Sequence, residues 1–199
     1  MLYSIYWKRI ILYLIILTLF TFMIAGCARW PDDPNGGNGI GQKLLRVRVD
    51  INENGSINTE EGNYYIVFDA DKDAPFSPPD DIGDWQTGYY YIRLDIFGFF
   101  FGEVLDSGAS EQSIGGSGGT GSDNYFQVTI PLSYLGEPEG IHINVVTTDL
   151  DNETYDALNP DFYIDTDSVF SKTETDFMQD STGGADFDII QVTTTILIP

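Results

Sequence analysis

The chain has 199 residues, of which 31 are Asp or Glu and nine are Lys or Arg, so its formal net charge at pH 7 is −22. Such an acidic surface repels the phosphates of nucleic acids and of anionic lipid headgroups, which excludes a nucleic-acid partner. A single cysteine, Cys27, excludes an intramolecular disulfide. Solubility or a saline habitat would explain the acidity without a ligand, whereas clustered carboxylates would indicate cation binding.

The N-terminus has the pattern of a secretory signal. Two basic residues precede an apolar run over residues 10–25, and small residues follow it, as they do at a signal cleavage site. The tetrad Ile24-Ala25-Gly26-Cys27 resembles the lipobox of bacterial lipoproteins. This resemblance implies that the signal peptide, residues 1–26, is removed and that Cys27 carries a diacylglycerol. The alternative is an uncleaved transmembrane anchor, since the apolar run is close to the minimum length for one.

Lipidation of Cys27 would place the protein outside the cytoplasm, attached to a membrane by acyl chains such as palmitate. Two or more chains anchor stably, because each buried methylene contributes about 0.8 kcal/mol. Removal of the signal leaves seven basic and 31 acidic residues, a net charge of −24. Ala28 and Arg29 stand where an aspartate commonly retains lipoproteins at the inner membrane. We therefore expect outer-membrane residence if the cell has two membranes.

The rest of the chain divides into a tether and one domain. Residues 27–42 comprise the lipidated cysteine and a flexible tether, because they are too polar and too rich in glycine to form a core. Residues 43–199 are numerous enough for one domain with a hydrophobic core. Within this domain, the Gly- and Ser-rich segment 115–122 predicts a flexible loop between two strands.

The domain has the sequence periodicity of β-strands, and a single helical turn is predicted, at residues 132–135. Strand segments alternate apolar with polar residues or are rich in aromatic and β-branched residues. Turns with Gly, Pro, Asp and Asn separate them. They predict an all-β fold, an antiparallel β-sandwich of the jelly-roll or immunoglobulin-like type. The predicted strands are residues 45–51, 64–68, 88–97, 126–130, 141–145 and 187–198.

One segment has the spacing of a calcium-binding loop. From Asp50 to Glu61, oxygen-bearing side chains occupy the first, third, fifth and twelfth positions, and Gly55 occupies the sixth. Calcium takes about six to eight oxygen ligands, which alternate side chains of a tight loop supply. The segment resembles an EF-hand loop, although strands flank it where that family has helices. The alternative is a turn between two strands, since Asn-Gly is a common turn pair. The predicted ligands are Asp50, Asn52, Asn54, Ser56 and Glu61.

Other acidic groups follow later strands. Asp69, Asp71 and Asp73 occupy alternate positions and would repel one another by up to about 1 kcal/mol per close pair unless a cation lies among them. We include these three as candidate calcium ligands. A third acidic group lies between residues 149 and 167, and solvated loops are the alternative for both groups. We expect no haem and no nucleotide, because His142 is an ordinary strand residue and the glycine tract lacks the lysine of a phosphate-binding loop.

Aromatic residues form the other candidate site. Sugars stack on exposed aromatic rings, so Trp85, Tyr89 and Tyr91 are candidate ligand-binding residues. Successive strand residues point to opposite faces, so we expect Tyr90 in the core and Tyr89 and Tyr91 at the surface. The alternative is a large aromatic core, since each ring buries about 150–250 Å².

Residues 64–71, 126–136 and 143–149 are similar to segments of bacterial lipoproteins with a sandwich fold like that of DOMON domains and carbohydrate-binding modules. The resemblance implies a ligand-binding sandwich and gives no substrate. Catalysis is not expected, because Cys27 is committed to lipid and His142 has no partner motif. We expect a non-catalytic, membrane-anchored module that binds a glycan or an envelope protein, with calcium as a stabilising ion. The alternative is a structural or protein-interaction component of the envelope that docks through the strand at residues 97–101.

Overall fold

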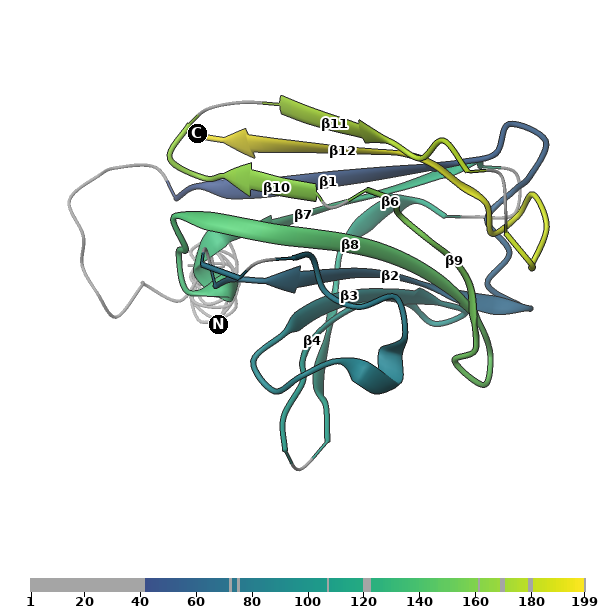
Figure 1. Ribbon diagram of the computed structural model, residues 1–199, viewed down its shortest axis with the longest axis horizontal. Coiled ribbons are helices and arrows are strands. Elements are labelled where there is room, and N and C mark those ends of the chain that lie inside the picture. The colour runs from purple at the N-terminus through teal and green to yellow at the C-terminus, as the bar shows by residue number, and fades with distance from the viewer. Residues whose placement is uncertain are drawn as a thin grey trace, which may run out of the picture. The chain divides into compact units, whose positions relative to one another are not determined.

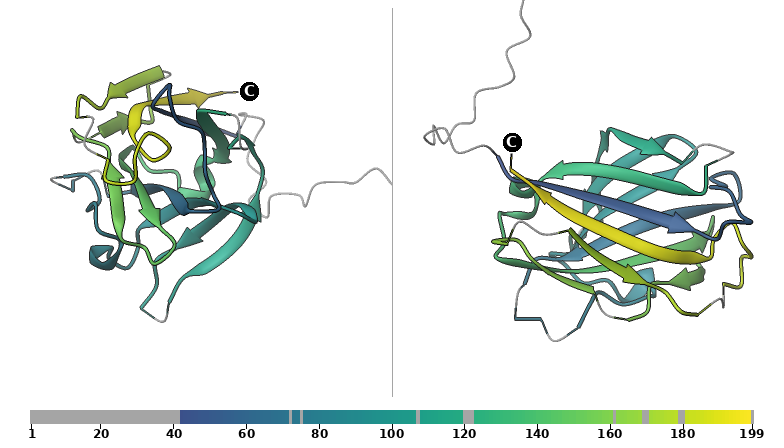
Figure 2. Two further views of the ribbon diagram at one scale, coloured as in Figure 1. Left: turned by 90° about the vertical axis from the view of Figure 1, so that its right-hand side faces the viewer. Right: turned by 90° about the horizontal axis from the view of Figure 1, so that it is seen from above.

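The structure is a computed structural model, and it describes residues 42–198 apart from 72, 75, 107, 120–122, 161, 169–170 and 179–180. The predicted signal peptide, Cys27 and the tether up to residue 41 lie outside the described residues. The described part of the domain forms twelve strands and two short 3₁₀-helices, and the strands make two antiparallel sheets packed against each other (Figures 1 and 2). The prediction of an all-β sandwich is confirmed.

The first sheet has five strands in the order β11-β12-β1-β7-β6. The central strand β1 pairs with β12 on one side, where Leu44 lies opposite Leu197, and with β7 on the other. Its apolar residues point inward because side chains alternate along a strand, while Arg46 and Arg48 lie on the outer face. The five strands are β1 (Leu44–Ile51), β6 (Gly116–Gly118), β7 (Tyr125–Pro131), β11 (Ser171–Thr175) and β12 (Ile189–Leu197).

The second sheet has seven strands, six of them in the order β10-β8-β2-β3-β4-β5, and β9 pairs with β8. β5 continues into β6 through Gly115 alone, so the chain passes there from the second sheet to the first. The seven strands are β2 (Gly62–Asp69), β3 (Tyr90–Asp95), β4 (Gly98–Glu103), β5 (Ser110–Ile114), β8 (Gly140–Asp149), β9 (Thr154–Ala157) and β10 (Phe162–Asp165).

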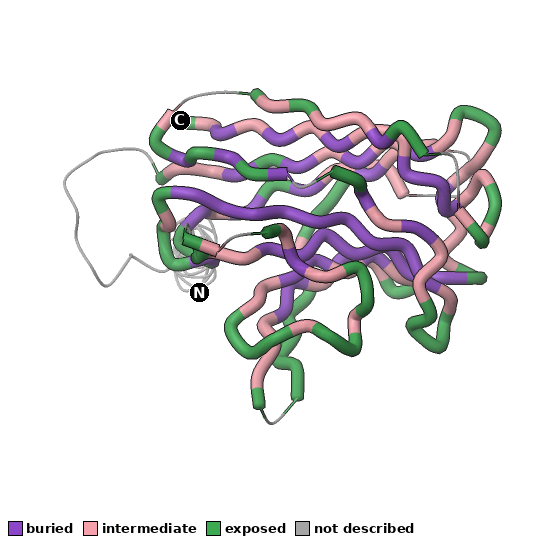
Figure 3. The backbone as a smooth tube through the Cα atoms, viewed as in Figure 1, coloured by how far each residue is buried: buried purple, intermediate pink, exposed green. Residues whose placement is uncertain are grey.

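The main core lies between the two sheets and is made of their inward-facing apolar side chains. Tyr64 and Phe126 are among the largest fully buried residues. The strands β2 and β8 are buried along almost their whole length on both faces (Figure 3). Alternation alone would leave every second residue of these strands exposed, so other segments must cover the outer face of the second sheet.

Two predicted segments differ from the structure. The predicted strand 88–97 is shorter, and the phenylalanine-rich segment after it is a separate strand, β4, which lies between β3 and β5. Residues 97–101 are therefore not a sheet edge, and the prediction that they form a docking edge is wrong.

Residues 116–118 of the predicted flexible loop form strand β6. Gly116 fits there because a Cβ atom would lie 2.3 Å from the Phe99 ring.

The helical turn predicted at residues 132–135 is confirmed as the 3₁₀-helix η2 (Leu132–Leu135), which buries Leu132 and Leu135. The short strands β9, β10 and β11 were not predicted, because they contain only four or five residues each and carry several polar side chains.

Candidate functional site

Seven aspartates and one asparagine at turns each accept a hydrogen bond within their own turn. A side-chain oxygen of each accepts a hydrogen bond of 2.7–3.0 Å from the backbone N–H two residues later. This geometry is the Asx turn, which replaces a backbone turn hydrogen bond with a side-chain one. It gives the aspartates that recur at strand ends a structural role in their turns. The residues are Asn52, Asp69, Asp71, Asp81, Asp95, Asp149, Asp165 and Asp176.

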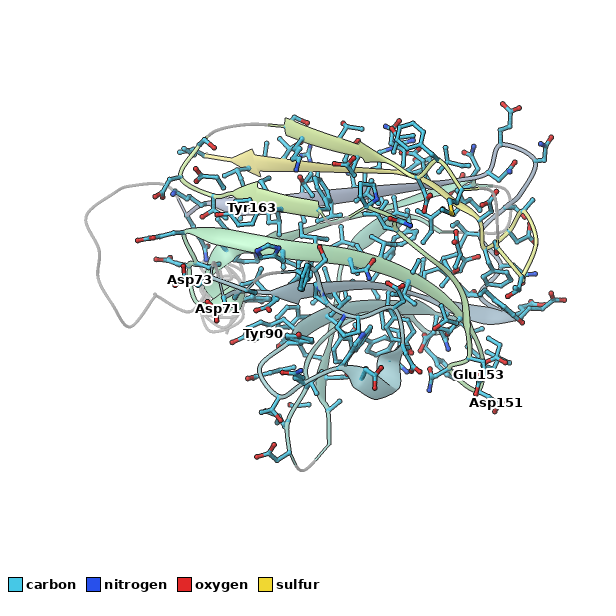
Figure 4. The ribbon with its side chains drawn as sticks, in the orientation of Figure 1. Asp71, Asp73, Tyr90, Asp151, Glu153 and Tyr163 are labelled. Carbon is cyan, nitrogen blue, oxygen red and sulfur yellow. The ribbon has the colours of Figure 1, made fainter. Side chains whose placement is uncertain are left out.

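The structure separates the acidic groups in space. Asp71 and Asp73 lie at one end of the sandwich, and Asp151 and Glu153 lie at the other (Figure 4). Within the described residues, no group of three or more His, Cys, Asp or Glu side chains is arranged to hold a metal ion.

Of the predicted calcium ligands in this loop, the side chains of Asp50, Asn52 and Asn54 form hydrogen bonds to other protein groups. The Asp50 carboxylate accepts two hydrogen bonds of 3.0 Å from Arg48 Nε. The side chain of Asn52 bonds to both Asn54 and Asp188, and the Ser56 N–H donates to Asp186 at 2.9 Å, while Glu61 is exposed. These contacts join the loop to the segment before β12. Calcium binding at this loop stays a prediction.

Trp85, Tyr89 and Tyr91 do come together, as part of a second apolar cluster on the outer face of the seven-stranded sheet. The Trp85 ring lies 5.8 Å from that of Tyr91 and meets Tyr65 edge-on at 5.5 Å. Tyr90 packs against the main core, as predicted. The expectation that Tyr91 faces solvent is wrong, because the segment that carries Trp85 covers it and leaves it 5% exposed.

Trp85 also fixes the segment before it. Its indole N–H donates to the Pro79 carbonyl at 2.9 Å, across the 3₁₀-helix η1 (Ile82–Asp84). The same segment is held to β8 by the Asn144 amide, which donates to the Pro78 carbonyl and to Asp80 Oδ1, each at 2.8 Å. The hydroxyl of Thr154 donates to the Asp80 carbonyl at 3.0 Å. These bonds place Asp80 against β8 and β9.

Two adjoining cavities lie where this segment meets β8 and β9, and we call them together the Asp80 groove. Their volumes are about 390 and 210 Å³, and Asp80 and Asn159 line both. The sequence did not reveal the groove, because its walls come from four separate segments that only the fold brings together. The lining residues are Ser77, Pro78, Pro79, Asp80, Asn144, Met178 and residues 154–160.

The groove combines free polar groups with apolar surface. The second carboxylate oxygen of Asp80 and the Asn159 amide make no hydrogen bond to any described residue, and both side chains are exposed. Phe76 and Phe177, next to the lining residues Ser77 and Met178, are 69% and 83% exposed. A carboxylate accepts hydrogen bonds, an amide both donates and accepts them, and rings supply stacking surface. This set of groups suits a ligand that has hydroxyl groups and an apolar face.

One acidic side chain in the groove wall is buried. Burial in low dielectric, helped by the nearby carboxylates of Asp176 and Asp188, raises the pKa of Asp156 to about 7. Hydrogen bonds from the backbone N–H groups of Ile189 and Ala157, at 2.7 and 2.9 Å, oppose this shift in the pKa. Asp156 therefore changes charge near neutral pH, which is unusual for an aspartate.

In the described part of the chain, no helix combines the length and the apolarity needed to cross a membrane. The residues on which the lipoprotein prediction depends lie outside that part. The similarity to DOMON domains and carbohydrate-binding modules stays a prediction, since comparison with protein families, curated proteins and solved structures finds no match for this chain.

Proposed function

We propose that this protein is a non-catalytic surface lipoprotein whose β-sandwich binds a carbohydrate in the Asp80 groove. The observation that carries the proposal is the groove, in which the free oxygen of Asp80 and the free amide of Asn159 lie beside apolar side chains. The larger cavity, at about 390 Å³, is within the range of about 300–1,000 Å³ usual for ligand sites.

The charge of the protein favours a neutral ligand. No Lys or Arg is among the lining residues of the groove, and the domain has a large excess of acidic residues. A ligand with carboxylate or sulfate groups would be repelled. Neutral sugars avoid this repulsion, and their hydroxyls can donate to Asp80 and pair with Asn159.

The geometry also supports recognition over catalysis. Asp80 and Asp156 are the two carboxylates of the smaller cavity. Both oxygens of Asp156 already accept backbone hydrogen bonds, from Ala157 and from Ile189. Glycoside hydrolysis uses a pair of carboxyl groups, and of this pair only Asp80 keeps an oxygen free of hydrogen bonds to described residues.

Substitutions at the groove test the carbohydrate proposal. Full-length protein in detergent is expected to bind neutral glycans on an array. Asp80→Ala should weaken binding about tenfold or more, because a hydrogen bond to a charged group contributes about 1.5–3 kcal/mol. Asn159→Ala should weaken it about two- to tenfold, because a neutral hydrogen bond contributes about 0.5–1.5 kcal/mol. Calorimetry with a positive glycan measures the change. Asp84→Ala, an exposed carboxylate on η1 that does not line the groove, is the matched control. Binding that survives both groove substitutions would show that the site is elsewhere.

The anchor has a separate test. Mass spectrometry of the protein from its native membrane is expected to find Cys27 at the N-terminus with a diacylglycerol on its sulfur. Cys27→Ser should release the domain from the membrane, since the hydroxyl of serine does not replace the thiol and no acyl chain then enters the bilayer. An intact N-terminus with a free thiol would refute the anchor and leave the groove proposal standing.

A second candidate, a protein-interaction role in the envelope, has one observation in its favour. Ile96 and Phe97 in the β3–β4 turn and Leu150 in the β8–β9 turn are 58–79% exposed. Both turns lie at the end of the sandwich where β2 begins. A silent glycan array, together with an envelope protein whose co-purification is lost in Phe97→Ser, would favour this role.

A further inference from the structure

We propose that two neighbouring turns of the sandwich form a docking surface for a basic, amphipathic helix of a partner protein. The turns are β3–β4, which carries Ile96 and Phe97, and β8–β9, which carries Leu150, and we call these three residues the turn patch. The inference rests on the protein-interaction role given above as the second candidate, and it names the chemistry of the partner. It does not depend on the Asp80 groove, which none of the three residues lines.

The turn patch presents large apolar side chains to solvent. Ile96, Phe97 and Leu150 are 58%, 79% and 60% exposed, which places them among the most exposed large apolar side chains of the described residues. Contact with a partner would remove their surface from water, and this is the main favourable contribution to the association of proteins. Exposed apolar residues that lie close together on a folded domain therefore indicate an interaction site.

Hydrogen bonds within both turns fix the backbone that carries the turn patch. In the β3–β4 turn, the Phe97 N–H donates to Asp95 Oδ1 at 2.7 Å. In the β8–β9 turn, Asp149 Oδ1 accepts from the N–H groups of Asp151 and Glu153, each at 2.8 Å. A surface whose backbone is ordered before binding loses little conformational freedom when a partner docks, so more of the gain from burial appears as affinity.

The spacing of the two turns suits one face of an α-helix. Strands β3 and β8 pair with opposite sides of β2, where Tyr64 lies between Leu94 and Thr147. Two strand spacings therefore separate the turns, a distance of about 10 Å. Side chains seven residues apart on a helix lie on the same face and about 10.5 Å apart along its axis. One helix laid across the beginning of β2 can thus contact both turns through a single apolar stripe.

The charges around the turn patch select a basic helix. Glu60 lies two residues before β2, and Asp151 and Glu153 belong to the β8–β9 turn (Figure 4). All three are exposed, and none forms an ion pair with a described Lys or Arg. Arg93 of β3 is already paired with two carboxylates, and neither turn nor the β1–β2 loop contains a Lys or Arg. A helix with Lys or Arg beside its apolar stripe complements these charges, whereas an acidic helix is repelled.

Calorimetry with two designed peptides tests this docking surface. Each peptide has about 14 residues, or four helical turns, with two leucines seven residues apart; the other positions are alanine and lysine in one peptide, and alanine and glutamate in the other. Full-length protein in a non-ionic detergent should bind the lysine peptide and not the glutamate peptide, with empty micelles as the blank. Phe97→Ser or Leu150→Ser should weaken binding about tenfold or more, because each removes a large apolar side chain from the contact.

The chain offers matched controls for both the apolar and the charged residues. Phe76→Ser replaces a phenylalanine that is 69% exposed beside the Asp80 groove, and it should keep the wild-type affinity. Asp151→Asn together with Glu153→Gln should weaken binding about two- to tenfold, as expected for two partly exposed ion pairs. Asp84→Asn together with Glu137→Gln removes two exposed carboxylates from the loops at the other end of the sandwich and should have little effect.

The outcomes separate this inference from the proposed function. Equal binding of both peptides, or binding that survives Phe97→Ser and Leu150→Ser, would overturn the docking surface. An equal loss of affinity in the two charge-removing pairs would indicate general attraction to an acidic chain and would overturn it too. Absence of lysine-peptide binding by wild type would overturn the basic helix, yet the protein-interaction role would stand if Phe97→Ser still abolished co-purification of an envelope protein. Glycan binding in the Asp80 groove is measured separately and is unaffected by each of these results.

Discussion

Replacing Tyr64 with alanine is expected to destabilise the domain by about 3–5 kcal/mol, the range for deletion of a large buried aromatic side chain. Tyr64 is fully buried, and its ring stacks on Phe187 at 5.3 Å and meets Phe126 edge-on at 5.6 Å. Its hydroxyl donates to the Asp186 carbonyl at 2.9 Å and accepts from the Asn58 N–H at 2.8 Å. The Tyr64 side chain thus joins the main core to the loop between β1 and β2 and to the segment before β12.

Urea unfolding measures the loss, with Tyr64→Phe as the matched variant. Phenylalanine keeps the ring but removes two hydrogen bonds to part-buried backbone groups, each of which contributes about 0.5–1.5 kcal/mol, so about 1–3 kcal/mol should be lost. Small domains are stable by only about 5–15 kcal/mol, so Tyr64→Ala should unfold at much lower urea than wild type. A loss below 1 kcal/mol for Tyr64→Ala would mean that this contact network is not formed.

Replacing Trp85 with alanine is expected to lower both stability and glycan affinity, although Trp85 does not line the Asp80 groove. Its ring covers Tyr65 and Tyr91, and its N–H fixes the Pro79 carbonyl next to Asp80. We expect a loss of about 2–4 kcal/mol, because the ring is half-buried and its removal exposes the cluster beneath. With the segment released, Asp80 is no longer held against β8 and β9.

Trp85→Phe separates this indirect role from direct stacking on a sugar. Phenylalanine retains an aromatic face but cannot donate to Pro79, so a positioning role predicts weaker binding together with faster hydrogen exchange in residues 78–85. Calorimetry and exchange mass spectrometry give the two readouts. Full affinity in Trp85→Phe, with unchanged exchange, would instead assign the ring itself to the ligand.

The strands that could be predicted are those whose pattern is local. β1 and β7 alternate apolar with polar residues, and this period of two fixes both the strand and the face that it buries. The burial of Tyr91 could not be predicted, because it depends on a loop that packs over the outer face of its strand. The tyrosine alternation therefore placed Tyr90 correctly and Tyr91 incorrectly.

The candidate site was less predictable than the fold. Asp80 and Asn159 carry only turn signals in the sequence, and the bonds from Asn144 and Thr154 that place Asp80 cross more than sixty residues. The acidic residues at strand ends had a clear pattern, but the same pattern fits an Asx turn as well as a metal ligand. In the folded chain Asp69 and Asp71 do form Asx turns, and calcium binding by them stays a prediction.

The passage of the chain from β5 into β6 has a consequence for how copies of the domain behave when they are crowded together. β5 and β6 end where the chain crosses between the sheets at Gly115, and all the outermost strands of both sheets are short, with three to five residues each. Long unpaired edge strands pair with strands of neighbouring molecules, which leads to aggregation. Short edge strands present few unpaired N–H and C=O groups for such pairing. Copies of this domain can therefore stay separate, as individual molecules, at high local concentration.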